Sequence, residues 1–286
     1  MQQLFARCFL FFSSLLSSTT FLVQSVSVSK LHSSASTVHL EETMVLSLST
    51  GKIRGRLIRT SASKSGYAFQ GVPYAEPPLG DLRFRPPVAK KPWDGTLDCL
   101  DYKAACPSNS SKTTSPQSVI DEDCLTVNKT SMCKKMCMWK IHVRNLGKTG
   151  KVLLYIHGGG WLFDSPRMFP PEELIENFAA EGIVAVLVGY RLGALGFWTT
   201  GTAEAPGNYG IHDVVESLRW IHREIGRFGG DPAQITLMGH SSAASGASLL
   251  GMSPVAAPLF RRVVAMSDSA FAAGLLEEDS TTAFKG

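Results

Sequence analysis

The sequence predicts an α/β protein in which a mostly parallel sheet is covered by helices. Short apolar runs at residues 151–156, 183–188 and 235–238 have the length and composition of buried strands. Helical patterns lie between these runs, most clearly at residues 211–228, where apolar residues recur at steps of three and four. Strands that alternate with helices pair in parallel, because each crossover helix covers one face of the sheet.

The elements outside these runs follow from local signals. Residues 45–56 predict a hairpin whose turn lies near Gly51. Residues 71–93 contain several prolines, which favour an irregular surface segment. Further along, a double proline followed by two glutamates predicts a helix that starts at residue 170 and ends near residue 182. Small residues at 243–250 favour another helix, and an apolar run at 263–266 favours a fourth strand.

Length and charge narrow the class of protein. The 286 residues fit one large domain or two small ones, and the formal net charge is +4. No basic stripe with interleaved aromatic residues occurs, so nucleic acid is not an expected partner. No cofactor or metal is expected, and zinc is disfavoured because no histidine pair lies at ligand spacing near the cysteines. No protein partner is indicated.

The first residues have the pattern of a secretory signal peptide. Arg7 supplies the positive charge, an apolar run follows at residues 8–16, and small residues near Ser25 and Ser27 suit cleavage there. We therefore expect a signal peptide at about 1–29 and a secreted, extracellular chain from residue 30. Serines and threonines interrupt the apolar run, and no later run is long enough, so no stable membrane span is expected.

Secretion changes the interpretation of the cysteines and of two asparagines. An oxidising compartment favours disulfides, and an odd number of cysteines leaves one thiol free or bonded to another chain. Five of the six cysteines follow the predicted cleavage point: Cys99, Cys106, Cys124, Cys133 and Cys137. Asn109 and Asn128 begin glycosylation sequons, which predict surface loops.

Two glycine-containing motifs point to chemistry at a serine. Ser241 lies two residues after Gly239, directly behind a predicted strand and before a predicted helix. A tight turn between strand and helix presents a nucleophilic hydroxyl, and small flanking residues let the helix pack closely. Three glycines at 158–160 follow another strand, where backbone N–H groups can approach an oxyanion. The alternatives are an ordinary serine and a merely permissive turn.

These motifs stand in an order that resembles the type B carboxylesterases, the family that includes cholinesterases and neuroligins. The matching segments span roughly residues 45 to 270: Phe69–Gly80, Leu82–Pro87, Glu122–Leu125, His157–Trp161, Tyr190–Gly193, Gly207–Gly210 and Phe228–Ser241. The resemblance implies an α/β-hydrolase fold and hydrolysis of a small carboxylic ester through an acyl-enzyme.

The resemblance also assigns roles to particular residues. Ser241 would be the nucleophile, and the backbone N–H groups of Gly159, Gly160 and Ser242 would form the oxyanion hole. The early disulfide of the family would join Cys106 to Cys124, with Cys99 as the weaker candidate.

Three departures from the family affect this interpretation. Ala243 replaces the glycine usual after the elbow, and its methyl group is expected to crowd the helix against the strand. Residues 129–145 fit the family poorly. All seven histidines precede Ser241, although this fold places the acid and then the histidine after the serine.

We therefore interpret residues 30–286 as the N-terminal portion of a carboxylesterase domain whose sheet is incomplete at its C-terminal edge. Such a chain is expected to be inactive, because the acid and the histidine of the triad are missing. The first alternative is a non-catalytic, esterase-like binding or adhesion module. The second is a chain that does not fold stably alone, since the strand at 263–266 would be a bare apolar edge.

Overall fold

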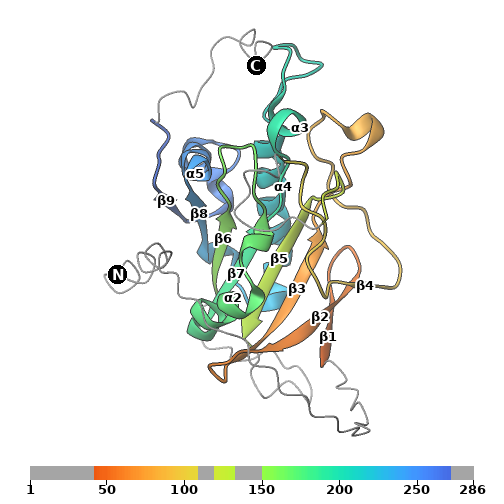
Figure 1. The fold of residues 1–286 in the computed structure, drawn as a ribbon, viewed down its shortest axis with the longest axis vertical. Coiled ribbons are helices and arrows are strands. Elements are labelled where there is room, and N and C mark those ends of the chain that lie inside the picture. The colour runs from red at the N-terminus through yellow and green to blue at the C-terminus, as the bar shows by residue number, and fades with distance from the viewer. Residues whose placement is uncertain (1–41, 109–118, 133–149, 272–286) are drawn as a thin grey trace, which may run out of the picture. The chain divides into compact units, whose positions relative to one another are not determined.

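The computed structural model describes residues 42–108, 119–132 and 150–271, and within these ranges nine strands form one mixed sheet (Figure 1). The strands are β1 (Thr43–Ser47), β2 (Lys52–Arg59), β3 (Ser65–Pro73), β4 (Thr96–Asp98), β5 (Thr126–Met132), β6 (Lys151–Ile156), β7 (Ile183–Val188), β8 (Ile235–His240) and β9 (Arg262–Met266). Their order is β1-β2-β3-β5-β7-β6-β8-β9, with β4 paired to β2. The predicted signal peptide, Asn109, Cys133 and Cys137 lie outside the described residues.

The first half of the sheet is antiparallel. β1 and β2 form the predicted hairpin, in which Ser47 pairs with Lys52. The hairpin continues through β3 to β5, and β5 pairs antiparallel with β7. At the turn, Gly51 has a φ of 151°, and a Cβ atom there would lie 2.5 Å from the Trp93 indole. This position therefore requires glycine because both its backbone angle and its neighbour exclude a side chain.

The second half is parallel, as the sequence predicts. β6 lies between β7 and β8, and β8 pairs with β9, all in parallel register. β7 is buried along almost its whole length, as expected for an uncharged run covered on both faces. Because these strands point the same way, the segments that follow β6 and β8 emerge at the same edge of the sheet.

Helices cover both faces of the sheet. The α-helices are α2 (Pro171–Asn177), α3 (Gly193–Phe197), α4 (Tyr209–Glu224) and α5 (Ser242–Met252). Ala68 and Phe69 are neighbours in β3 and point to opposite faces. Ala68 packs with Ile175 of α2, whereas Phe69 meets Phe228, after α4, edge to face with ring centroids 5.5 Å apart. α2 and α4 thus cover opposite faces, and the larger hydrophobic core lies on the α4 side.

β5 is an element that the sequence does not reveal, and it corrects one expectation. Asn128 lies in this central strand with only 3% of its surface exposed, and its Oδ1 atom accepts a hydrogen bond from the Gly71 backbone N–H at 2.8 Å. The expectation that Asn128 lies in a surface loop is therefore wrong, because a glycan on its amide would have no room. Residues 71–93 are largely irregular as predicted, with the end of β3 and one short 3-10 helix, Gly80–Leu82.

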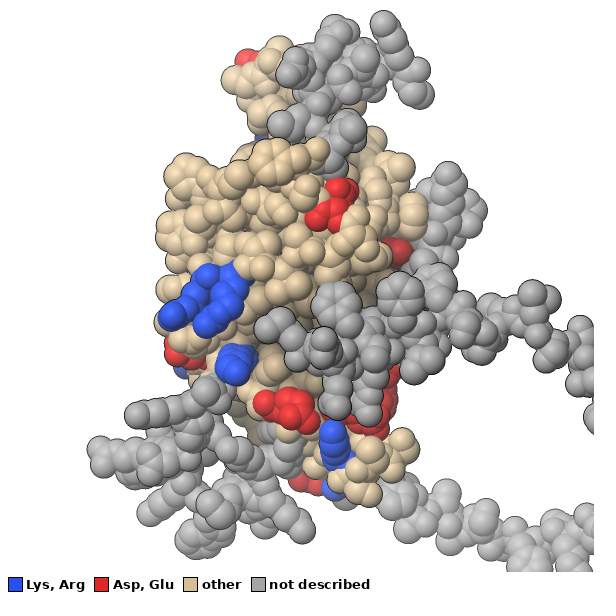
Figure 2. All heavy atoms as spheres, turned by 90° about the vertical axis from the view of Figure 1, so that its left-hand side faces the viewer, with Lys and Arg blue, Asp and Glu red and all other residues tan. Residues whose placement is uncertain are grey.

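β9 is the last strand of the sheet within the described residues and has an apolar exposed surface. Val263 and Val264 are 37% and 40% exposed, and Met252 and Val255 nearby are also exposed. Figure 2 views this side of the molecule and shows a broad area without Lys, Arg, Asp or Glu side chains. An apolar sheet edge of this kind favours pairing with further polypeptide. No helix among the described residues has the length and apolarity needed to cross a bilayer.

Candidate active site

Ser241 occupies a strained turn between β8 and α5. Its backbone angles are φ 54° and ψ −132°, outside the regions that a residue with a side chain ordinarily adopts. The turn is held by a hydrogen bond of 2.9 Å from the Ser241 N–H to the Met266 carbonyl oxygen at the end of β9. A strained serine between a parallel strand and the helix that follows it has the geometry of a nucleophile elbow.

The residues around Ser241 let the helix fold back onto the strand. A Cβ atom on Gly239 would overlap the Ala243 carbonyl group, so glycine is required at this position. Ala243, whose methyl group was expected to crowd the helix, is completely buried in the main core. α5 packs against both β8 and β9, which fixes the elbow at the edge of the sheet.

The glycine loop that follows β6 lies beside this elbow. Ile156 at the end of β6 is paired with Gly239 near the end of β8. Gly159 and Gly160 have φ angles of 102° and 62°, which favour glycine. The Gly159 carbonyl oxygen accepts hydrogen bonds from the N–H groups of Leu162 at 3.0 Å and Phe163 at 3.2 Å.

The contact between loop and elbow is tightest at Gly158. A Cβ atom there would lie 2.6 Å from the His240 carbonyl oxygen and 3.1 Å from the Ser241 Cβ atom. The structure therefore brings the sequence-predicted residues Gly159, Gly160, Ser241 and Ser242 to one end of two neighbouring strands. Backbone N–H groups close to a nucleophilic hydroxyl can stabilise a developing oxyanion without reorganisation.

The two histidines nearest the site, His157 and His240, differ in burial. His157 is 2% exposed, its Nδ1 atom lies 3.0 Å from the Gly158 carbonyl oxygen, and its ring stacks on Tyr190 with centroids 4.6 Å apart. Burial lowers the pKa of His157 to about 4, with the Gly158 hydrogen bond and Asp164 acting in the opposite direction. His157 is therefore neutral near pH 7 and supports the glycine loop. His240 follows Gly239 at the exposed end of β8.

A buried ion pair that the sequence did not predict joins the segment after β7 to α4. Asp213 of α4 accepts two hydrogen bonds from the Arg191 guanidinium, at 2.7 and 2.8 Å, and a third from the Arg191 backbone N–H at 3.1 Å. Both side chains are almost completely buried, at 3% and 0% exposure. The pair fastens the segment after β7 to α4. Arg191 stands within the family-like segment 190–193, but the sequence carries no signal for its partner.

The Cys106 and Cys124 side chains form a disulfide, with Cα atoms 5.0 Å apart. Cys99 is buried and has no disulfide partner among the described residues. Burial raises the pKa of the Cys99 thiol to about 12, so it stays protonated. The disulfide therefore joins the two cysteines that the family resemblance implies. Cys99 is an unreactive core side chain within the described structure.

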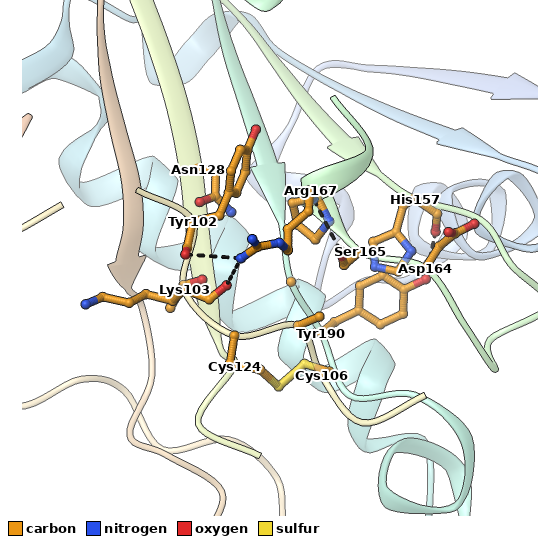
Figure 3. A pocket seen from close by; sticks show the side chains of 15 residues that line it. Tyr102, Lys103, Cys106, Cys124, Asn128, His157, Asp164, Ser165, Arg167 and Tyr190 are labelled. Carbon is orange, nitrogen blue, oxygen red and sulfur yellow. Dashed lines mark hydrogen bonds between the residues drawn. A yellow bond between two sulfur atoms is a disulfide. The ribbon is translucent and has the colours of Figure 1, made fainter. Parts of the chain in front are cut away.

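A small cavity lies between this disulfide and the end of β7, as Figure 3 shows. Its wall includes Arg167, which donates hydrogen bonds to the carbonyl oxygens of Tyr102 at 3.3 Å and Lys103 at 3.2 Å. Ser241 and Gly160 do not line it. The cavity is thus a feature of the scaffold behind the glycine loop and is separate from the serine. Within the described ranges, no cluster of three or more His, Cys, Asp or Glu side chains could hold a metal ion.

The strained serine, the helix behind it and the glycine loop define an α/β-hydrolase. The model of the carboxylesterase family matches residues 42–285, and the chain belongs to this family. It is 35% identical to gut esterase 1 of Caenorhabditis briggsae over 203 residues, which are 71% of this chain and 34% of the relative.

Two vertebrate relatives match with similar identity over a longer part of the chain. The chain is 35% identical to cocaine esterase of Oryctolagus cuniculus over 241 residues, covering 81% of this chain and 43% of the relative. It is 34% identical to acylcarnitine hydrolase of Mus musculus over 242 residues, covering 81% of this chain and 41% of the relative. The chain therefore spans well under half the length of the curated relatives that it matches.

Proposed function

We propose that this chain carries the nucleophile and the oxyanion hole of a secreted serine esterase that cleaves small carboxylic esters. The single observation behind the proposal is the strained Ser241 beside a glycine loop, in a chain of the carboxylesterase family. Two of these relatives are named for hydrolysis of cocaine and acylcarnitines, so the proposed substrate class is a carboxylic ester rather than a peptide or phosphate.

The proposed reaction has two stages. The Ser241 hydroxyl oxygen attacks the ester carbonyl carbon, and the carbonyl oxygen becomes an anion that the N–H groups of Gly159, Gly160 and Ser242 stabilise. The intermediate collapses, an alcohol leaves with a proton, and an acyl group stays on Ser241. Water then attacks the acyl-enzyme in the same way and releases the acid. Each oxyanion donor is worth about 3 kcal/mol of barrier.

Turnover also needs a base that accepts the Ser241 proton and an acid that orients the base. His157 is excluded because it is buried against Tyr190, and His240 is the neighbour of Ser241 at a sharp turn. No histidine follows Ser241 in the sequence. We therefore propose that the 286-residue chain alone reacts once with activated reagents and does not turn over esters at an appreciable rate.

The test is covalent labelling of the secreted full chain with a fluorophosphonate, followed by intact mass measurement and peptide mapping. We expect one added phosphonyl group on Ser241, none in Ser241→Ala, and unchanged labelling in Ser242→Ala, because residue 242 contributes only its backbone N–H. Added imidazole, as an external base, should accelerate the reaction. A cooperatively folded chain that takes no label would contradict the proposal.

The second candidate function is a non-catalytic binding module. The observation that favours it is that neither His157 nor His240, the described histidines beside the site, is placed to accept the Ser241 proton. Under this alternative, the folded chain stays unlabelled both with and without imidazole. The N-terminal residues 1–29 are proposed as its signal peptide in either case, and cleavage is checked by N-terminal sequencing of the secreted protein.

A further inference from the structure

Trp161, the residue after the three glycines, has an unusual backbone conformation. Its φ angle is 63°, in the left-handed region that is uncommon for a large side chain. Its carbonyl oxygen accepts a hydrogen bond of 2.7 Å from the Gly193 N–H at the start of α3. The indole ring is half-buried and meets the rings of Tyr190 and Phe197, with centroids 5.9 and 5.3 Å away.

The indole also rests on the backbone of the nucleophile helix. A Cβ atom on Gly246 would lie 2.5 Å from Cη2 and 3.0 Å from Cζ2 of Trp161. Gly246 stands one helical turn after Ser242, so it shares the face of α5 that begins beside the serine. Ile211 of α4 closes the other side, 3.6 Å from the same Cβ position. Glycine at residue 246 is therefore what lets the ring reach the helix.

The glycine loop needs an anchor of this kind. Three successive residues, Gly159, Gly160 and Trp161, have positive φ angles, so the loop has no helical or strand pairing of its own at this point. Oxyanion donors work only if their positions are fixed before the reaction, and a misplacement of about 1 Å can reduce a rate about a hundredfold. The large, rigid indole of Trp161 packs against α5, the helix that follows the serine, and so fixes the distance between this helix and the glycine loop.

We propose that the contact between Trp161 and Gly246 sets the distance of the glycine loop from the nucleophile helix, so that Trp161 is a positioning residue for the oxyanion hole. The inference rests on the proposed function, since it concerns the N–H groups of Gly159 and Gly160. In this proposal Trp161 acts through the position of the glycine loop and takes no part in the chemical step itself.

The first experiment is a cycle of Gly246→Ala and Trp161→Phe in the full chain, followed by the rate of fluorophosphonate labelling. The methyl group of Gly246→Ala displaces the indole, and we expect labelling to slow about tenfold to a hundredfold. In the double variant, the shorter phenyl ring leaves room for the methyl group, and the rate should recover most of this loss. Because residues in contact couple in stability as well, the rate is measured on fully folded protein, where a contact that matters only for stability would leave labelling of Gly246→Ala unchanged.

The matched control is Gly226→Ala, because no described atom beyond its own helical turn lies within 4 Å of a Cβ atom at that glycine. This control should label at the wild-type rate. Wild-type labelling in Gly246→Ala, or no recovery in the double variant, overturns the positioning role while leaving Ser241 as the nucleophile.

A second measurement keeps the inference testable if the wild-type chain takes no label and the proposed function fails. The chain is produced with 5-fluorotryptophan, and the Trp161 signal is assigned by its loss in Trp161→Phe. We expect Gly246→Ala to shift this fluorine signal and Gly226→Ala to leave it in place. An unshifted signal in Gly246→Ala means that the ring does not rest on the helix, which overturns the inference independently of any reactivity.

Discussion

A Cβ atom on Gly158 would lie 3.1 Å from the Cβ atom of Ser241, closer than an ordinary van der Waals contact, so the glycine loop approaches the nucleophile elbow this closely because residue 158 is glycine. The contact follows from the parallel pairing of β6 with β8, because Ile156 at the end of β6 lies opposite Gly239 near the end of β8. Sequence positions 158 and 241 are far apart, but the sheet makes them neighbours. The proposed chemistry depends on this meeting, since a serine without nearby N–H donors has nothing to stabilise its oxyanion.

The first prediction concerns Gly158 itself. In Gly158→Ala, the methyl group would lie 2.6 Å from the His240 carbonyl oxygen, and backbone atoms give way poorly. We expect a loss of about 1–3 kcal/mol in the free energy of unfolding and little or no labelling of Ser241. Urea denaturation and intact mass measure the two effects. Wild-type labelling in this variant would show that the loop does not approach the serine.

The second prediction concerns the buried pair of Arg191 and Asp213. Asp213→Asn leaves the guanidinium buried without its counterion, which typically costs about 3–5 kcal/mol of the free energy of unfolding. The control is Asp98→Asn, which breaks the exposed ion pair with Arg54 and should cost less than about 1 kcal/mol. Urea denaturation at pH 7 compares the two. Equal losses would contradict the burial of the Arg191 pair.

The third prediction concerns Lys129 in the middle of β5. This side chain is 1% exposed, its Nζ atom lies 3.3 Å from the centroid of the Phe228 ring, and no described group hydrogen-bonds to it. Burial holds the pKa of Lys129 well below its ordinary value of 10.5, so the folded state favours the neutral amine.

It follows that folding at neutral pH requires Lys129 to lose a proton or to bury a charge. Lys129→Met removes this penalty and should raise the urea midpoint at pH 7, whereas Lys151→Met at the exposed start of β6 should not. The unfolded state binds the extra proton, so the penalty shrinks as the pH rises toward the unfolded pKa near 10.5. An advantage of the Met variant that does not shrink with rising pH would contradict this account.

The fourth prediction concerns His157 and the free energy of unfolding at acidic pH. The pKa of His157 is about 4 in the folded state against 6.5 ordinarily, because burial disfavours the charged ring. Between these values the unfolded state binds more protons, so the free energy of unfolding falls as the pH drops through this window, by roughly 3 kcal/mol. The loss is complete near pH 4.

His157→Phe keeps a ring on Tyr190 and removes this titration. The difference in free energy of unfolding between wild type and variant should therefore change between pH 7 and pH 4, as measured by urea titrations at each pH. A constant difference across that range would mean that His157 is solvated in the folded state.

The parallel half of the sheet could be predicted from the sequence because its strands are short apolar runs between helical patterns. β7 is uncharged and β-branched, and it occupies residues 183–188 as predicted. The elbow was also predictable, because Gly239 and Ser241 have the required spacing. Its strained angles, the contact with Gly158 and the seat of Trp161 on Gly246 depend on the folded backbone.

β5 could not be predicted because its residues look polar. Asn128 and Lys129 suggest a solvated segment, but pairing with β3 and β7 buries them both. The ion pair of Arg191 and Asp213 is equally hidden, because its partners lie 22 residues apart on different elements. In each case the burial of the side chain depends on a partner that is distant in the sequence, and no local sequence pattern predicts that partner.

The central claim is tested most directly by a crystal structure of the chain after reaction with a fluorophosphonate. The phosphoryl oxygen on such an adduct stands where the oxyanion of the ester intermediate would be. We predict that this oxygen lies about 2.7–3.1 Å from the backbone nitrogens of Gly159, Gly160 and Ser242. An adduct on Ser241 whose phosphoryl oxygen points away from these nitrogens would contradict the account.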